Sequence, residues 1–213
     1  GQGAWDNRMH GSDWTGCNPD DYLLCYESYV SLSHTESYVM EDYFGLLDDT
    51  EGRSLLTEKV DLGVGRLPFE SASQARAKVE RIIEYMQGAY SGAWCNRILV
   101  LGDDGDNNAH MEDADKMAGI YQNLNPAVDV RKIYWDAFPL EVTSSSNGYP
   151  SVRKLLLEQF DEGSLIVNYS GHGSTGEISH ERVLTKADMA NLKSKRLPFW
   201  ITASCDISPF DSP

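Results

Sequence analysis

The chain has 213 residues, 41% of them hydrophobic, so it can bury a core in one domain or in two small halves. Its formal net charge is −15, with 33 acidic against 18 basic residues. This balance argues against a nucleic-acid partner, because phosphate binding needs clustered lysine and arginine. No run of about 18 apolar residues occurs, so we expect no transmembrane helix.

The first sixty residues are rich in glycine, aspartate, serine and tyrosine and show no regular hydrophobic period. This composition predicts surface loops with a few short strands. Residues 60–67 then alternate apolar and polar side chains and stop at Pro68, which predicts a strand.

From residue 71 onward, segments with helical periodicity alternate with short apolar runs. Ser71 is placed to cap the first helix and Gly88 to end it, while Thr185 and Asp188 form a capping pair for a fourth, short helix. This alternation predicts an α/β fold with a mostly parallel sheet and helices on both faces. The other expected helices cover about residues 71–88, 111–124 and 152–163, and the strands cover residues 98–101, 128–135, 165–169 and 199–203.

Two of these strands run directly into residues that can do chemistry. The strand at 165–169 leads into His172, and the strand at 199–203 leads into Cys205. Adjacent parallel strands lie about 4.8 Å apart, so side chains at their carboxyl ends can meet. Only a thiolate attacks, and free cysteine has a pKa of about 8.5, so a reactive cysteine needs a base. Either residue alone is more often structural, but together they predict a nucleophile, Cys205, and its base, His172.

The glycines around the histidine fit this interpretation. Gly171 and Gly173 carry no side chains that would block a substrate from reaching the imidazole. The amides of Gly173 and Cys205 are then candidates for an oxyanion hole.

The same glycines match G-x-G-x-x-G, the dinucleotide fingerprint, over residues 171–176. In that motif a helix opens directly at the loop, whereas residues 177–181 are polar and the next helix is expected only near Thr185. Because the helix that this motif requires is not expected directly after the loop, the sequence argues against nucleotide binding.

Acidic residues gather in the loop at residues 103–108, after the strand at 98–101. Carboxylates and amides on a turn suit calcium, with Asp103, Asp104, Asp106 and Asn108 as candidate ligands. The alternative is an acid-rich helix N-terminus, favourable to the helix dipole. Asp103 is also a candidate to orient His172. The chemistry itself requires no cofactor.

The remaining histidines show no ligand spacing and are interpreted as surface or loop residues: His10, His34, His110 and His180.

The four cysteines are too few for a disulfide scaffold. Cys17 and Cys25 are close enough in sequence to form one disulfide, and both the bridged and the unbridged state remain open. Cys95 is interpreted as a small apolar residue of the interior.

Residues 168–173 (NYSGHG) and 197–205 (LPFWITASC) resemble the histidine and cysteine motifs of the gingipain-type peptidases, family C25. Residues 64–68 (VGRLP) and the helix that follows are similar to that family as well. The resemblance covers about residues 37–213, with Ser204 standing where threonine is expected. It implies a caspase-like three-layer fold, a cysteine-peptidase activity, and protein or peptide substrates.

Within that family, three segments look most like the sortases of type IX secretion: residues 41–49 (EDYFGLLDD), 103–108 (DDGDNN) and 180–185 (HERVLT). That resemblance implies an enzyme secreted or held on the outer surface of a Gram-negative, Bacteroidetes-type bacterium. It would remove C-terminal signals from secreted cargo, alongside outer-membrane secretion components.

Two other functions are compatible with the same residues. One is a gingipain-like endopeptidase that degrades proteins broadly, and the other is a catalytically idle caspase-like binding domain. An intact His172 and Cys205 count against the idle domain.

We expect residues 1–92 to form the loop-rich N-terminal part of the peptidase region, ending in a strand and a helix. Residues 93–213 are expected to form its catalytic α/β subdomain, truncated at the C-terminus because the family resemblance implies further strands.

Overall fold

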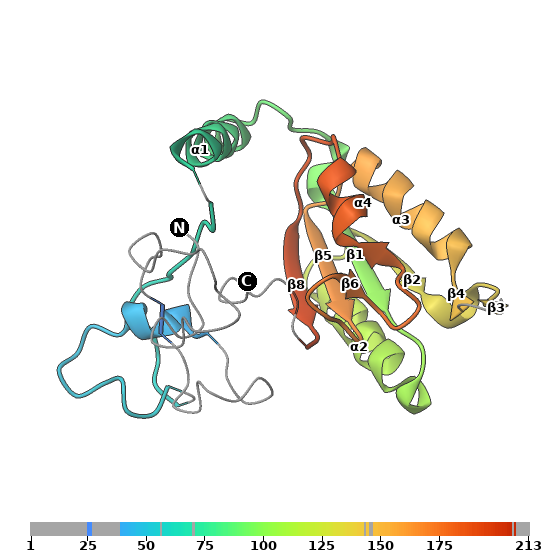
Figure 1. Ribbon diagram of the computed structural model, residues 1–213, viewed down its shortest axis with the longest axis horizontal. Coiled ribbons are helices and arrows are strands. Elements are labelled where there is room, and N and C mark those ends of the chain that lie inside the picture. The colour runs from blue at the N-terminus through green and yellow to red at the C-terminus, as the bar shows by residue number, and fades with distance from the viewer. Residues whose placement is uncertain are drawn as a thin grey trace. The chain divides into compact units, whose positions relative to one another are not determined.

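The computed structural model describes residues 25–26, 39–55, 57–69, 71–142, 144, 147–205 and 207 (Figure 1). The chain divides into two compact units, with the boundary between Ile83 and Glu84, inside helix α1 (Ala72–Met86). The division predicted at residues 92 and 93 falls after this helix, at the start of the short η3 helix (Ala93–Asn96). Cys17 lies outside the described residues, so its pairing with Cys25 stays a prediction.

In the first unit, the described residues form a short 3-10 helix, η2 (Glu41–Gly45), then irregular chain, and then the larger part of α1. The strand predicted over residues 60–67 is wrong: this segment is irregular, and the Asp61 amide donates to Gly45 O at 2.9 Å. Gly63 and Gly65 interrupt the alternation, and glycine weakens a strand because it has high backbone entropy and no side chain to pack.

The second unit, Glu84–Ser208, contains a four-stranded sheet in the order β2-β1-β5-β8. All three strand pairs are parallel, which confirms the predicted α/β class. The strands of this sheet are β1 (Arg97–Gly102), β2 (Asp129–Tyr134), β5 (Ile166–Ser170) and β8 (Phe199–Ala203).

Helices cover both faces of this sheet, as the sequence predicts (Figure 1). Alternate residues of β1 point to opposite sides, so Leu99 and Leu101 join one core cluster while Ile98 and Val100 join another. The first cluster includes residues of α3 (Pro150–Glu162), and the second includes residues of α2 (Ala109–Leu124). All four β1 residues are at most 5% exposed, which explains the unbroken apolar run in the sequence.

Short elements complete the second unit. Helix α4 (Lys186–Asn191) begins at the predicted capping pair: the Asp188 amide donates to Thr185 Oγ1, and the Thr185 amide donates to the Asp188 carboxylate. Two small antiparallel pairs, which the periodicity did not predict, are β3 (Glu141–Val142) with β4 (Asn147–Gly148) and β6 (Glu177–Ile178) with β7 (Leu184–Thr185). Among the helices of the described chain, none is long and apolar enough to cross a membrane.

Candidate active site

Three strands of the sheet end level with one another, and each leads into a candidate site residue. In the strand register, Gly102 of β1 pairs with Ser170 of β5, and Ser170 pairs with Ala203 of β8. Asp103 follows the first of these positions directly. His172 and Cys205 each stand two residues beyond a paired position, so they leave the same edge of the sheet from adjoining strands. The register therefore places the candidate base and the candidate nucleophile side by side along the edge.

The loop that carries His172 packs directly against the loop that carries Cys205. The Gly171 amide donates to Ala203 O at 3.2 Å. A methyl group added at Gly173 would lie 2.5 Å from Ser204 Oγ and 2.9 Å from Cys205 O. Glycine is therefore required at 173 because protein atoms fill the space beside it, which differs from the substrate access expected from the sequence. A methyl group at Gly171 would likewise meet Tyr169 Oη and Asp103 Cβ.

The Gly173 amide is oriented away from its neighbouring strand. Gly173 and Ile178 form an antiparallel bridge. The two hydrogen bonds around this bridge run from Ser174 N to Glu177 O and from Ser179 N to His172 O, both at 2.9 Å. Gly173 is thus in a non-hydrogen-bonded position, where the N–H and C=O of the residue point outward from the pair. This orientation is compatible with the predicted oxyanion role of Gly173, which stays a prediction.

The peptide groups of His172 are held on both sides by buried partners. Its amide donates to Asp103 Oδ2 at 2.9 Å, and its carbonyl accepts from Tyr169 Oη at 2.6 Å. Asp103 is 1% exposed and Tyr169 is fully buried. Two core side chains therefore fix the main chain from which the imidazole projects.

Burial raises the pKa of Asp103 to about 6, although the hydrogen bond from the His172 amide partly offsets this effect. The nearby carboxylates of Glu181 and Asp104 raise the pKa further. Asp103 was expected to orient His172, and the structure shows how it can do so: through the main chain, with the carboxylate on the amide and not on the ring.

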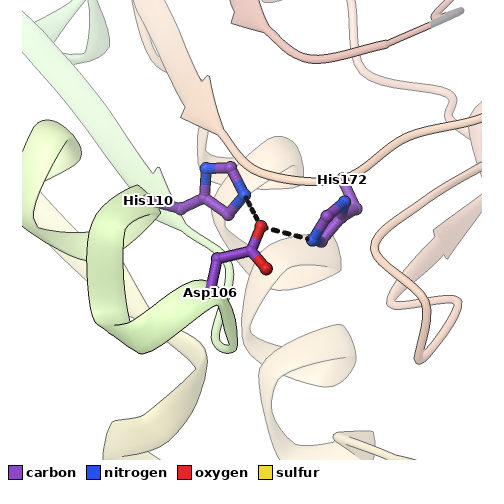
Figure 2. Close-up of side chains that lie close together, drawn as sticks. All are labelled: Asp106, His110 and His172. Atoms are coloured by element: carbon purple, nitrogen blue, oxygen red, sulfur yellow. Dashed lines mark ion pairs between the residues drawn. The ribbon is translucent and has the colours of Figure 1, made fainter.

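A different carboxylate contacts the imidazole. Asp106 Oδ2 lies 3.0 Å from His172 Nε2, and Figure 2 shows the carboxylate between the rings of His172 and His110. The His110 ring lies edge-on to the His172 ring with centroids 5.0 Å apart, and the His180 ring stacks on His172 at 4.2 Å. The candidate base is thus enclosed by one acid and two further imidazoles.

These neighbours were not identified from the sequence. His110 was interpreted as a surface or loop residue, but it lies in the first turn of α2 and is only partly exposed. Its spacing of four residues from Asp106 gave no helical signal, because residues 106–108 have positive φ and α2 begins only at Ala109. His180 is exposed, as interpreted, and nothing in its spacing indicated the stack on His172.

The four residues proposed as calcium ligands do not form one group. Asp103 and Asp104 lie close to Glu181, with one carboxylate oxygen from each within 4.8 Å of the others. Asp106 belongs to the histidine group instead. Asn108 has a left-handed backbone with φ of 69° and stands directly before α2. A hard cation would fit the three carboxylates best, and Glu181 is a candidate that the sequence did not single out.

Cys205 is exposed, and it carries a free thiol. A cavity of about 460 Å³ lies between the loop after Gly173 and the face of β8. Its lining is mostly apolar, with Glu177 and Lys186 as the charged side chains; the apolar residues are Ile178, Leu184, Met189, Trp200 and Ile207. The cavity is large enough for an extended peptide side chain.

The parallel sheet with helices on both faces defines an α/β protein, in which a histidine and an exposed cysteine follow adjoining strand ends. The sequence profile of Peptidase family C25 matches residues 1–213, and the chain belongs to this family. Among solved structures, the Arg-specific cysteine proteinase gingipain R is similar at 19% sequence identity and a TM-score of 0.46. That match covers 64% of this chain, and this chain spans about 30% of the gingipain R chain. A comparison with curated proteins finds no match.

Proposed function

We propose that this chain is the catalytic region of a C25 cysteine peptidase, with Cys205 as nucleophile and His172 as general base. The observation that carries the proposal is the close approach of Gly173 to Ser204 Oγ and Cys205 O at adjoining strand ends, which leaves no space for a methyl group. Family membership over residues 1–213 supports the same assignment.

The proposed reaction is acyl transfer. His172 accepts the thiol proton of Cys205, and the thiolate attacks the scissile carbonyl carbon. The carbonyl oxygen takes up the negative charge and accepts hydrogen bonds from the amides of Gly173 and Cys205. When the C–N bond breaks, His172 returns the proton to the leaving amine, and an acyl-thioester remains on Cys205. Water or a second amine then attacks the thioester and releases the acyl group.

The first test needs no substrate. At neutral pH, iodoacetamide should alkylate Cys205 faster than Cys95 or the other cysteines, because a thiolate paired with an imidazole is the reactive species. The His172→Ala variant should slow labelling of Cys205 about tenfold, since the thiol then has no neighbouring base to accept its proton. Peptide mass mapping at several times gives each rate. Labelling of another cysteine while Cys205 stays unmodified in the folded protein would refute the dyad.

We further propose that the substrates are secreted proteins with C-terminal sorting signals, processed at the surface of a Gram-negative cell by a sortase-like enzyme of type IX secretion. The motifs at residues 41–49, 103–108 and 180–185 support this finer assignment. The alternative with the same dyad is a broad endopeptidase, and an idle binding domain is the alternative without chemistry.

A tagged C-terminal signal peptide, incubated with and without an amine acceptor, separates these functions by mass spectrometry. A sortase-like enzyme should form the amine adduct, and a Cys205→Ala variant should not. Equal cleavage of unrelated peptides with no adduct would favour the broad endopeptidase. No cleavage of any peptide despite a reactive Cys205 would favour the idle domain.

A further inference from the structure

Two imidazoles and one carboxylate converge beside the candidate dyad, within the second unit. Asp106 Oδ2 lies 3.2 Å from His110 Nε2 and 3.0 Å from His172 Nε2 (Figure 2). One ligand atom from each of the three residues lies within 4.8 Å of the other two. A carboxylate that only oriented His172 would need no second imidazole on the same oxygen.

Hydrogen bonding does not account for His110. Its Nε2 atom is buried and makes no hydrogen bond of acceptable geometry, despite the nearby Asp106 oxygen. A buried polar atom without a hydrogen bond costs free energy, so this nitrogen calls for a further partner. The atom lies 3.2 Å from the carboxylate oxygen that also contacts His172, and the missing partner belongs between the three residues.

The donor set and its spacing fit a tetrahedral transition metal. Zinc binds histidine nitrogen at about 2.0–2.1 Å and carboxylate oxygen at about 2.0–2.2 Å, which puts tetrahedral donors about 3.3 Å apart. The two observed oxygen–nitrogen distances, 3.0 and 3.2 Å, are within a few tenths of an ångström of that value. Two imidazoles favour zinc over calcium or magnesium, which prefer oxygen ligands. We infer that Asp106, His110 and His172 bind a zinc ion, with a fourth position open to water.

This site would make zinc an inhibitor, a consequence that rests on the proposed function. A neutral imidazole has one nitrogen lone pair, and the other nitrogen carries the proton. When His172 gives its Nε2 lone pair to zinc, Nδ1 keeps the proton and the ring cannot accept another from Cys205. Zinc binding and base catalysis by His172 therefore exclude each other, and removal of the ion restores the base.

Direct binding tests the site without any substrate. Protein freed of metal by a chelator is titrated with zinc by calorimetry, and with cobalt by visible absorption, which reports the geometry of the ligands. We expect one zinc ion per folded chain. The His110→Ala variant loses a ligand and should bind zinc at least about 10–100-fold more weakly. That is the loss in metal affinity seen when only a residue that hydrogen-bonds to a metal ligand is mutated. The matched control is His180→Ala, which removes the other ring beside His172 but no ligand nitrogen, and it should keep the wild-type affinity.

Melting curves of each variant without metal show whether it folds, and His110→Gln serves if His110→Ala does not. A Cys205→Ala variant shows whether the thiolate is the fourth ligand: binding that persists supports the three-residue site. Folded His110 variants that bind zinc as tightly as wild type would overturn the inference, and so would a cobalt spectrum of thiolate ligands alone.

Alkylation of Cys205 is the second readout. Zinc should slow it in wild type and not in the His110 variant. If zinc binds as expected while Cys205 of metal-free protein is unreactive, the zinc site stands and the proposed dyad fails.

Discussion

His172 is positioned by two carboxylates that act on different parts of the residue. Asp103 accepts from its amide at 2.9 Å, and Asp106 contacts its ring nitrogen at 3.0 Å. The two acids also differ in setting, since Asp103 is 1% exposed and Asp106 is exposed. Main-chain placement and ring orientation can therefore be tested separately.

The role of Asp103 depends on its hydrogen-bond acceptor and not on its charge. Asp103→Asn keeps an oxygen for the His172 amide, so alkylation of Cys205 should stay within about threefold of wild type. Asp103→Ala removes the acceptor and leaves a buried N–H without a partner, at a cost of about 1–3 kcal/mol in stability. Alkylation should then slow markedly. Denaturant unfolding and labelling rates measure both effects, and equal losses in the two variants would show that the charge matters.

Gly173 is a position where the two site loops are in close contact. Gly173→Ala places a methyl group 2.5 Å from Ser204 Oγ and 2.9 Å from Cys205 O, so the loops must separate. Overpacking of this kind costs about 1–3 kcal/mol, and a displacement of about 1 Å at the dyad can lower peptide cleavage about 100-fold.

Gly119→Ala, in α2, is the matched control, because an added methyl group there meets no atom within 4 Å and Gly119 does not line the cavity beside β8. Peptide cleavage should be close to wild type in this variant, and its melting temperature should not fall, since alanine is favoured over glycine in a helix. If Gly173→Ala behaves like Gly119→Ala, the contact between the two loops is not needed for activity.

At the scale of elements, α4 is attached to the fold through Asp188. Its carboxylate accepts from the Thr185 amide and hydroxyl at the start of α4, and it pairs with Arg153 of α3. Burial raises the pKa of the Asp188 carboxyl, but the hydrogen bonds from Arg153 and Thr185 outweigh burial and bring the pKa below its ordinary value. One residue thus caps a helix and joins it to its neighbour.

Asp188→Asn should destabilise the fold by about 1–2 kcal/mol at neutral pH, through the weakened cap and the lost ion pair. A carboxyl whose pKa is lowered on folding stabilises above its ordinary pKa, here 3.8, and loses that contribution as the pH falls through the folded value. The difference between wild type and variant should therefore shrink toward about pH 3. Urea unfolding at both pH values measures it, with the exposed Asp161→Asn as a control for net charge. A difference that is independent of pH would contradict this account.

For the whole molecule, the formal net charge is −15, and three of its acidic residues lie together near the candidate site. Asp103, Asp104 and Glu181 bring three carboxylates together, and Asp104 also accepts from Tyr149 Oη at 2.6 Å. Like charges at this separation repel, and a bound calcium ion would neutralise most of the repulsion. This geometry keeps calcium as a proposal, with Glu181 in place of Asp106 and Asn108.

Millimolar calcium should raise the melting temperature, because a ligand that binds only the folded state stabilises it, by about 2.7 kcal/mol at a hundredfold excess over the dissociation constant. A calcium chelator should lower the melting temperature again. Glu181→Gln should remove most of the shift, while Glu158→Gln, on the exposed surface of α3, should keep it. If neither calcium nor the chelator changes the melting temperature, these three carboxylates do not bind calcium.

The sequence by itself was enough to predict the α/β class, the strands of the parallel sheet and the two residues at adjoining strand ends. Those features are local: buried strands such as β1 are unbroken apolar runs, and His172 and Cys205 follow their strands directly. The predicted strand at residues 60–67 failed because alternation alone does not supply a pairing partner.

Only the tertiary structure decided which side chains surround His172. Asp106 and His110 come from the loop and helix after β1, and His180 comes from the turn between β6 and β7. Their approach depends on the sheet register and on how the loops pack at its edge. Neither quantity has a period in the sequence, so residues that are far apart along the chain met at one site without a detectable signal.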